Sequence, residues 1–180
     1  GHVEGLEIID GTEDYVVPNV DRLEPFLVGV VSPSDHWLYA SSAGGLAAGR
    51  VNAEGSLFPY RTDDLLHQVQ GFSGGWTGIR ENGVVWEPFT GRPSADIKRS
   101  LARSTAGDRL LLDEIHEGLG LQATACWCFS DRSGILRRVK ISRLDDRGGT
   151  RRIEVMDGLR DLVAGGAGVG VMQSMSCLIN

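Results

Sequence analysis

The chain has 180 residues, of which 41% are hydrophobic and 23% charged, and these values argue against a disordered chain. A formal net charge of -6 argues against a nucleic-acid-binding protein, because such proteins usually carry a basic face. No apolar run approaches the roughly 20 residues that span a bilayer, so we expect no membrane partner.

The first half of the chain predicts short strands separated by turns. Apolar, β-prone runs occupy residues 6–9, 26–31 and 37–41. A hairpin is predicted from residues 76–80 to 84–87, because the Asn82-Gly83 pair between them is typical of tight β-turns.

The stretch from Val51 to Phe72 contains turn residues without a clean period, and we predict a long loop there. Within this stretch, Asp63 to Gln70 predicts a short helix with Thr62 as its N-cap. Loops of this length in compact domains are usually functional or mobile, so this segment is a candidate for ligand contact.

The second half has the clearer strand pattern. Apolar residues alternate with polar ones from Leu121 to Ser130, which predicts a strand with one buried face. Further strands are predicted at residues 97–104, 109–116 and 135–144 and around Ile153, Val155 and Leu159. Strands at intervals of about 8–12 residues predict one all-β domain over residues 1–180, an antiparallel β-sandwich or barrel.

The two ends suggest that the chain is a fragment of a longer multidomain protein. It begins at Gly1 without a Met, and it stops on a fresh apolar run that reaches Asn180. A domain that ends naturally seldom finishes on such a run, so a longer parent chain is expected.

The cysteines and histidines predict neither a metal site nor a cofactor. Cys126, Cys128 and Cys177 form no disulfide framework, which favours a reducing, cytoplasmic location. Cys126 and Cys128 share a strand face, with Cα atoms about 6.6 Å apart, at the outer limit for a disulfide. The four histidines lack metal-ligand spacing and are interpreted as surface or capping residues.

A cluster of basic residues has two interpretations. The preferred one is the solvated face of a sheet, because the residues alternate along strands and mix with acids. The alternative is a phosphate or polyanion site. The residues are Arg137, Arg138, Lys140, Arg143, Arg147, Arg151 and Arg152.

Catalytic motifs are missing from the sequence. There is no G-x-S-x-G elbow, and Gly44-Gly45 and residues 165–168 are interpreted as tight turns, not phosphate loops. The acids Asp63 and Asp64 lie beside Tyr60 in the irregular segment, where they either contact a ligand or cap a short helix. We therefore predict no catalytic residue in this chain.

The four tryptophans all fall on predicted strands, where core packing is the default interpretation. Trp127 is predicted to be core. A sugar-binding interpretation needs an exposed aromatic platform, because aromatic faces stack on the apolar C–H faces of sugars, and it selects Trp76 and Trp86.

The order of several motifs resembles the N-terminal domain of the cellobiose phosphorylase family. Ser41-Ser42-Ala43-Gly44-Gly45 is followed by Phe58-Pro59-Tyr60-Arg61-Thr62-Asp63-Asp64, and then by a hairpin with Val85-Trp86-Glu87-Pro88. The later hairpins and Val155-Met156-Asp157-Gly158-Leu159 complete the order. Ala43 departs from the family's usual Asn or Thr, which leaves the substrate open.

This resemblance implies a galactose mutarotase-like supersandwich without catalytic residues of its own. It implies a downstream catalytic (α/α) barrel with a phosphate site, an oligosaccharide substrate and a homodimer. In such a dimer the segment from Gly44 to His67 walls the partner's active site. The implied substrate-binding candidates in and near that segment are Arg50, Tyr60, Asp63 and Asp64.

Three functions are therefore carried forward. The first is a non-catalytic module of a glycoside phosphorylase-like or hydrolase-like enzyme, which helps to form the substrate site. The second is a stand-alone carbohydrate-binding sandwich. The third is a structural sandwich that dimerises through a sheet face or edge.

Overall fold

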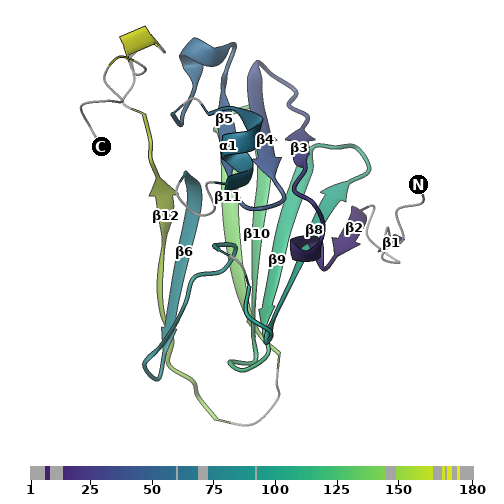
Figure 1. Cartoon of the computed structure of the whole chain (residues 1–180), viewed down its shortest axis with the longest axis vertical. Coiled ribbons are helices and arrows are strands. Elements are labelled where there is room, and N and C mark those ends of the chain that lie inside the picture. The colour runs from purple at the N-terminus through teal and green to yellow at the C-terminus, as the bar shows by residue number, and fades with distance from the viewer. Residues whose placement is uncertain are drawn as a thin grey trace.

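The computed structural model describes residues 7–8, 14–59, 61–68, 73–91, 93–144, 149–163, 168, 170–171 and 174 (Figure 1). The named helical elements are short: η1 (Val20–Arg22), η2 (Ala53–Gly55) and α1 (Asp63–Gln68). The strands are β1 (Glu7–Ile8), β2 (Asp14–Pro18), β3 (Leu27–Val30), β4 (His36–Ser41), β5 (Leu46–Arg50), β6 (Gly74–Glu81), β7 (Val84–Trp86), β8 (Ile97–Ser104), β9 (Arg109–His116), β10 (Leu121–Ser130), β11 (Gly134–Arg143) and β12 (Glu154–Arg160).

The strands form three antiparallel sheets. The large sheet has six strands in the order β1-β2-β8-β9-β10-β11, and two three-stranded sheets have the orders β12-β6-β7 and β3-β4-β5. Figure 1 shows β12 and β6 at one side of the molecule and β3, β4 and β5 in its upper part, with β8 to β11 running along its length. The predicted all-β, sandwich-like antiparallel architecture is confirmed.

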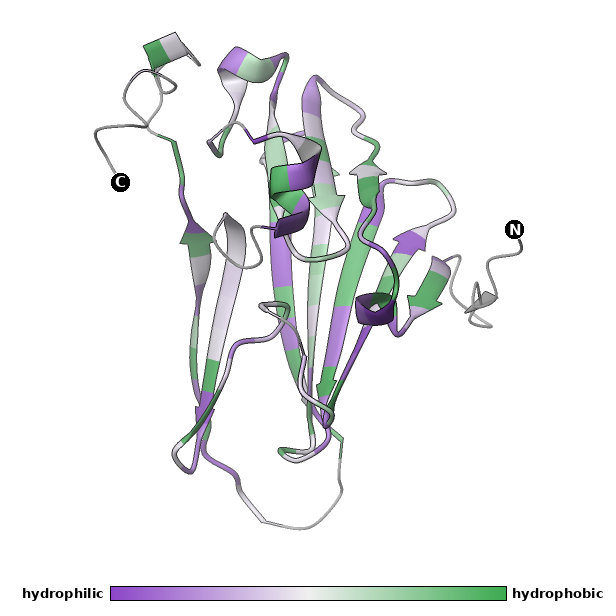
Figure 2. Ribbon diagram, in the orientation of Figure 1, coloured by the Kyte–Doolittle hydropathy of each residue, from purple (hydrophilic) through white to green (hydrophobic). Residues whose placement is uncertain are grey.

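The central strand β10 explains why the large sheet forms. It pairs with β9 on one side and with β11 on the other, and its odd-numbered residues Leu121, Ala123, Ala125 and Trp127 are buried. This is the period-two pattern of a strand with one face on a core. Hydrophobic and hydrophilic residues alternate along these strands in Figure 2.

The main core lies between the large sheet and the β3-β4-β5 sheet. One cluster of buried residues contains Leu38 and Ala48 from the small sheet together with Leu101, Leu110 and Trp127 from the large one. A second cluster joins Ile79 and Trp86 to Leu121 and Ala123, and so attaches the β12-β6-β7 sheet. Both small sheets therefore pack on one face of the large sheet.

The predicted hairpin at Asn82-Gly83 is present between β6 and β7. Glu81 pairs with Val84, and both turn residues have positive φ, 48° for Asn82 and 83° for Gly83. Two positive φ values are the signature of a type I′ turn, whose twist matches that of the flanking strands.

The predicted long loop from Val51 to Phe72 was only partly right, because η2 and a β-bridge between Gly49 and Ser56 give part of it regular structure. The short helix predicted from Asp63 is present as α1, which ends at Gln68, while residues 60 and 69–72 lie outside the described residues. Phe58 of this segment is buried, with an exposed fraction of 2%. Strands β2 and β5 were not predicted, because each is short and the pairing that holds it comes from other strands.

The interpretation of the basic cluster as one solvated face is corrected at two positions. Arg137 of β11 forms an ion pair with Asp157 of β12, and Arg151, in the segment before β12, forms one with the buried Glu81 of β6, so both guanidinium groups make tertiary contacts. Arg138, Lys140, Arg143 and Arg152 are exposed, while Arg147 lies outside the described residues. None of the helices in the described ranges is long and apolar enough to cross a membrane.

Candidate functional site

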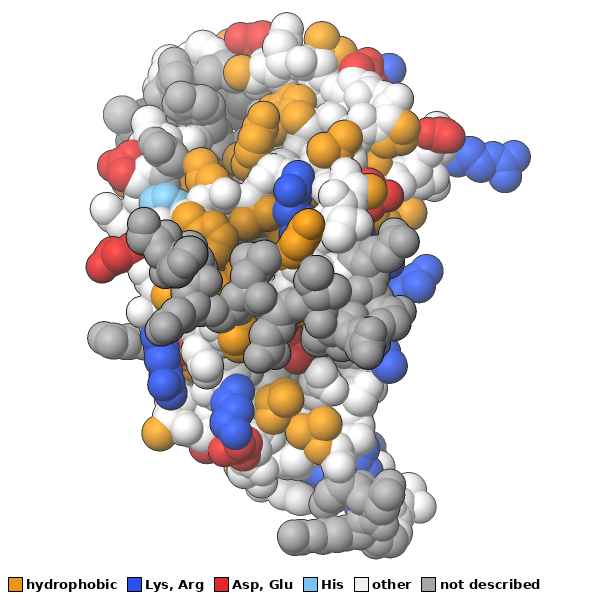
Figure 3. Space-filling view, turned by 90° about the vertical axis from the view of Figure 1, so that its right-hand side faces the viewer, with side chains coloured by type: hydrophobic (Ala, Val, Ile, Leu, Met, Phe, Trp, Pro, Cys, Tyr) orange, Lys and Arg blue, Asp and Glu red, His pale blue; other side chains and the backbone are white. Residues whose placement is uncertain are grey.

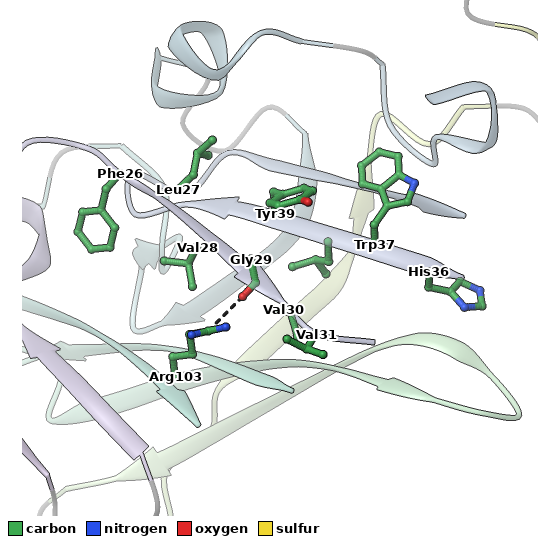
Figure 4. A pocket seen from close by; sticks show the side chains of 11 residues that line it. Phe26, Leu27, Val28, Gly29, Val30, Val31, His36, Trp37, Tyr39 and Arg103 are labelled. Carbon is green, nitrogen blue, oxygen red and sulfur yellow. Dashed lines mark hydrogen bonds between the residues drawn. The ribbon is translucent and has the colours of Figure 1, made fainter. Parts of the chain in front are cut away.

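The outer face of the β3-β4-β5 sheet carries two aromatic side chains. Strand alternation points Leu38 and Ala40 of β4 into the core, where both are buried, and Trp37 and Tyr39 to the opposite face. Figure 4 shows Trp37 and Tyr39 on the same side of the sheet. Tyr39 is 50% exposed, so solvent reaches a large part of its ring.

Glycines on the neighbouring strands let both rings lie close to the backbone. Gly49 is opposite Trp37 and Gly29 is opposite Tyr39 in the strand register. If Gly49 carried a Cβ atom, that atom would lie 2.5 Å from Trp37 Cζ2. A Cβ atom at Gly29 would lie 3.3 Å from Tyr39 Cε1. An aromatic ring that packs over a glycine on the neighbouring strand fills the space left by the missing side chain and so stabilises the strand pair there. The opposite face of each ring points away from the sheet.

The two rings form a continuous aromatic surface. Their centroids are 6.3 Å apart and their planes are inclined by 38°. Because Trp37 and Tyr39 are two residues apart on one strand, the strand itself sets this spacing. We call this pair the Trp37–Tyr39 surface.

A groove of 590 Å³ runs beside this surface and around the edge strand β3 (Figure 4). Leu27 and Val31 add apolar walls and are 40% and 55% exposed. Arg103 of β8 lines the groove on the other side of β3 from the two rings, and it donates from Nε to the Gly29 carbonyl oxygen at 3.1 Å. Figure 3 views the side on which β1, β2 and β3 lie, where hydrophobic side chains gather between charges of both signs.

Arg50, one of the predicted site residues, lies at the end of β5, one residue beyond Gly49. Its Nε donates to both carboxylate oxygens of Asp35 at 3.1 Å, and both side chains are exposed. This hydrogen bond is the largest cause of the lowered pKa of Asp35. Arg50 and Asp35 therefore place a charged pair at the end of the strands that carry the Trp37–Tyr39 surface.

The other predicted residues of the irregular segment are not brought to this surface by any described contact. Tyr60 lies outside the described residues, and Asp63 is the first residue of α1. Asp64 is exposed, and a hydrogen bond with Thr62 is the largest cause of its lowered pKa. The Thr62 carbonyl accepts the Leu66 N–H at 2.9 Å, which agrees with the predicted role of Thr62 as the N-cap of α1.

The predicted platform of Trp76 and Trp86 does not form, because the two side chains point to opposite faces of the β12-β6-β7 sheet. Trp86 is 3% exposed and donates from Nε1 to Glu114 Oε1 at 2.9 Å. Trp76 is half-buried, and the Arg160 guanidinium lies over its ring, 4.5 Å from the centroid. A buried ring and a covered ring cannot together present a stacking surface.

The segment after the β4–β5 turn is packed, not open. Ser41 Oγ lies 2.8 Å from His67 Nδ1 and accepts the Ala43 N–H at 3.0 Å. A Cβ at Gly45 would stand 2.1 Å from the Leu66 carbonyl oxygen, so α1 contacts the turn directly. Ser41 is completely buried and cannot reach a substrate, so its contact with His67 positions α1 on the hairpin.

Reactive groups are sparse among the residues that the structure describes. No group of three or more His, Cys, Asp or Glu side chains there could hold a metal ion. Cys126 and Cys128 are free and half-buried, and burial raises the pKa of the Cys126 thiol. The described arrangement is suited to binding a ligand by stacking and hydrogen bonding.

Sequence reasoning missed the Trp37–Tyr39 surface. The alternation Trp37-Leu38-Tyr39 was visible, but the importance of Gly29 and Gly49 depends on which strands pair with β4. The fold and this surface define an all-β, sandwich-like protein in which a half-buried tryptophan and an exposed tyrosine lie side by side on one sheet face. No protein-family model matches the chain, and the comparison with curated proteins gives no match.

Proposed function

We propose that this chain is a non-catalytic carbohydrate-binding module, and that it belongs to a larger carbohydrate-active enzyme of the glycoside phosphorylase type. The observation that carries the proposal is the Trp37–Tyr39 surface, in which the half-buried Trp37 ring and the exposed Tyr39 ring lie side by side over glycines on the outer sheet face. Aromatic faces stack on the apolar C–H faces of sugar rings, and Tyr and Trp each add a polar group for hydroxyls.

The surroundings of the surface support a sugar as the ligand. The adjoining groove combines apolar walls from Leu27 and Val31 with the guanidinium of Arg103, a mixture that suits an amphipathic ligand. Arg50 and Asp35 lie at the end of the same strands and offer donors and acceptors for hydroxyl groups. A nucleobase would also stack, but a net charge of -6 opposes a phosphate backbone.

The enzyme context is supported by the order of the motifs that resemble the cellobiose phosphorylase family. Under this proposal the layered antiparallel sheets are part of a galactose mutarotase-like supersandwich. The catalytic acid and the phosphate site then belong to a barrel domain elsewhere in the parent enzyme. The contact between α1 and the β4–β5 turn supports a rigid segment that could wall a substrate site.

The test is a titration of the purified chain with soluble cello-, malto- and laminari-oligosaccharides. Calorimetry or tryptophan fluorescence measures the binding. Trp37→Ala and Tyr39→Ala are each expected to weaken binding about tenfold, equivalent to about 1.4 kcal/mol. Trp76→Ala is the matched control, because Arg160 already covers that ring, and it should bind like the wild type.

Two results would contradict this proposal. One is a folded Trp37→Ala variant, checked by circular dichroism, that binds every glycan as tightly as the wild type. The other is turnover of any of these oligosaccharides by the isolated chain in phosphate buffer, because that would place catalysis in this chain.

A further inference from the structure

Two cysteines with free thiols share the outer face of the large sheet. Cys126 and Cys128 lie on β10, which runs between β9 and β11 along the length of the molecule (Figure 1). The odd-numbered residues of β10 face the core, so these two even-numbered residues point to the opposite face. Both are half-buried, so a small ion can reach them from solvent.

The spacing of the two thiols suits a bridging ion better than a disulfide. On an extended strand the Cα atoms of residues i and i+2 are about 6.6 Å apart. A disulfide draws its sulfur atoms to about 2.05 Å and usually needs a shorter Cα separation, so β10 would have to bend. An ion with two metal–sulfur bonds of about 2.3 Å in a line holds its sulfur atoms about 4.6 Å apart. Side chains that lean toward each other along the strand can span that distance.

Two arginines flank the pair. In the strand register Arg109 of β9 is opposite Cys128. Arg138 of β11 is opposite Cys126, and directly opposed side chains lie on the same face. Arg109 Nη2 donates to Asp14 at 2.6 Å, but its Nε is buried and has no hydrogen-bond partner among the described residues. A negatively charged group at the two cysteines would therefore be offset by two guanidinium groups.

The thiols also affect each other. Burial raises the pKa of the Cys126 thiol, and the neighbouring Cys128 raises it as well, while Arg109 and Arg138 act in the opposite direction. An ion that binds Cys126 must therefore displace its proton.

The ligand set selects the kind of metal ion. Thiolates are soft ligands, which favour Cu(I) over hard cations. Structural zinc takes four ligands, and the described residues offer no group of three or more His, Cys, Asp or Glu side chains that could hold a metal ion. Cu(I) is satisfied by two thiolates in a line.

We propose that Cys126 and Cys128 form a two-coordinate site for Cu(I), a soft monovalent cation, on the outer face of the large sheet. Each thiol loses its proton and forms one Cu–S bond, so one Cu⁺ and two thiols give a bis-thiolate complex of charge -1 and two free protons. Copper keeps its oxidation state. The Trp37–Tyr39 surface lies on the other side of the large sheet, so this inference is independent of carbohydrate binding.

The test is an oxygen-free titration in which the full chain competes for Cu(I) with the chelator bathocuproine disulfonate. Every protein carries Cys177→Ser, which removes the cysteine that lies outside the described residues. This background chain is expected to bind one Cu(I), as counted by native mass spectrometry. Cys126→Ser and Cys128→Ser are each expected to weaken binding more than about 100-fold, because losing a ligand costs more than the roughly 10–100-fold typical of outer-shell partners.

A rearranged pair separates a lost site from a damaged fold. Thr124→Cys combined with Cys128→Ser again places two thiols two residues apart on one face of β10, so it is expected to restore most of the affinity. Ser130→Cys combined with Cys128→Ser is the matched control, because its thiols are four residues and about 13 Å apart, too far for one ion to bridge.

The pH dependence distinguishes two thiol ligands from one. Release of two protons makes the affinity rise about 100-fold per pH unit in mildly acidic to neutral solution, whereas a single thiol gives about tenfold. A tenfold rise would overturn the proposal. So would a background chain that binds Cu(I) no more tightly than the two serine variants, or full affinity in the Ser130→Cys control.

Discussion

Glu114 shows how one buried side chain organises its surroundings. It is 1% exposed on β9 and accepts hydrogen bonds from Trp86 Nε1, the Phe89 N–H and Arg99 Nε, at 2.9, 3.0 and 2.6 Å. Arg99 is itself buried and also donates to the Thr90 and Gly91 carbonyl oxygens. The carboxylate therefore fixes the chain after β7 against the large sheet.

Replacing Glu114 by Ala is expected to destabilise the protein by about 3–5 kcal/mol, because Arg99 would keep its charge in the interior without a carboxylate. Urea unfolding followed by tryptophan fluorescence measures the loss. The matched control is Glu117→Ala, which removes an exposed ion pair with Lys98 and should cost less than about 1 kcal/mol. Equal losses for the two variants would contradict the role assigned to Glu114.

Among the elements, the β6–β7 hairpin depends most clearly on local chemistry. Gly83 has a φ of 83°, and a Cβ there would meet no atom within 4 Å. A side chain at this position is therefore opposed by backbone strain, not by crowding. The hairpin matters beyond itself, because it carries Trp86 to Glu114.

Gly83→Ala is expected to lower the free energy of unfolding by about 1–2 kcal/mol, the cost of a left-handed conformation for a residue with a Cβ. Gly83→Asn should cost less, because Asn tolerates that conformation better than Ala. Thermal unfolding of the three proteins gives the order. If the Asn variant were less stable than the Ala variant, backbone strain would not be the explanation.

At the scale of the whole molecule, Arg137 joins two sheets. It lies on β11, and its guanidinium donates to Asp157 of β12 and, at 2.8 Å, to Thr77 Oγ1 of β6. Thr77 Oγ1 also donates to Asp157 Oδ1 at 2.6 Å. A Cβ at Gly75 would stand 2.2 Å from Arg137 Nε, so a glycine is needed for this side chain to pass.

A double-mutant cycle with Arg137→Ala and Asp157→Ala measures this connection. We expect a coupling free energy of about 1.5–3 kcal/mol, the range for charged hydrogen bonds, because Arg137 is only 9% exposed. Arg138→Ala, the neighbour on the exposed face, should change stability by no more than about 0.5 kcal/mol. A coupling near zero would mean that the Arg137–Asp157 contact does not help to hold the small sheet on the large one.

Much of the fold could be predicted because it depends on local patterns. The strands β8, β9 and β10 begin and end at the predicted residues. Alternation predicted β10 and turn residues bounded its neighbours, and both signals are local, so they need no knowledge of the partners. The type I′ turn at Asn82-Gly83 was predicted from two residues. Strand β5 was missed, because Leu46-Ala47-Ala48-Gly49-Arg50 has weak strand propensity and is held by pairing with β4.

The sequence by itself determined the all-β class, the regular strands of the second half and the burial of Trp127, because each depends on composition or on a period along the chain. Only the tertiary structure decided which of the other tryptophans are fully buried and which are half-buried. In the folded chain Trp86 donates a hydrogen bond to Glu114, and the Arg160 guanidinium lies over Trp76. Strand pairing sets Gly29 opposite Tyr39 and Gly49 opposite Trp37. Those outcomes depend on which strands pair and in what register, and contacts between distant residues set both.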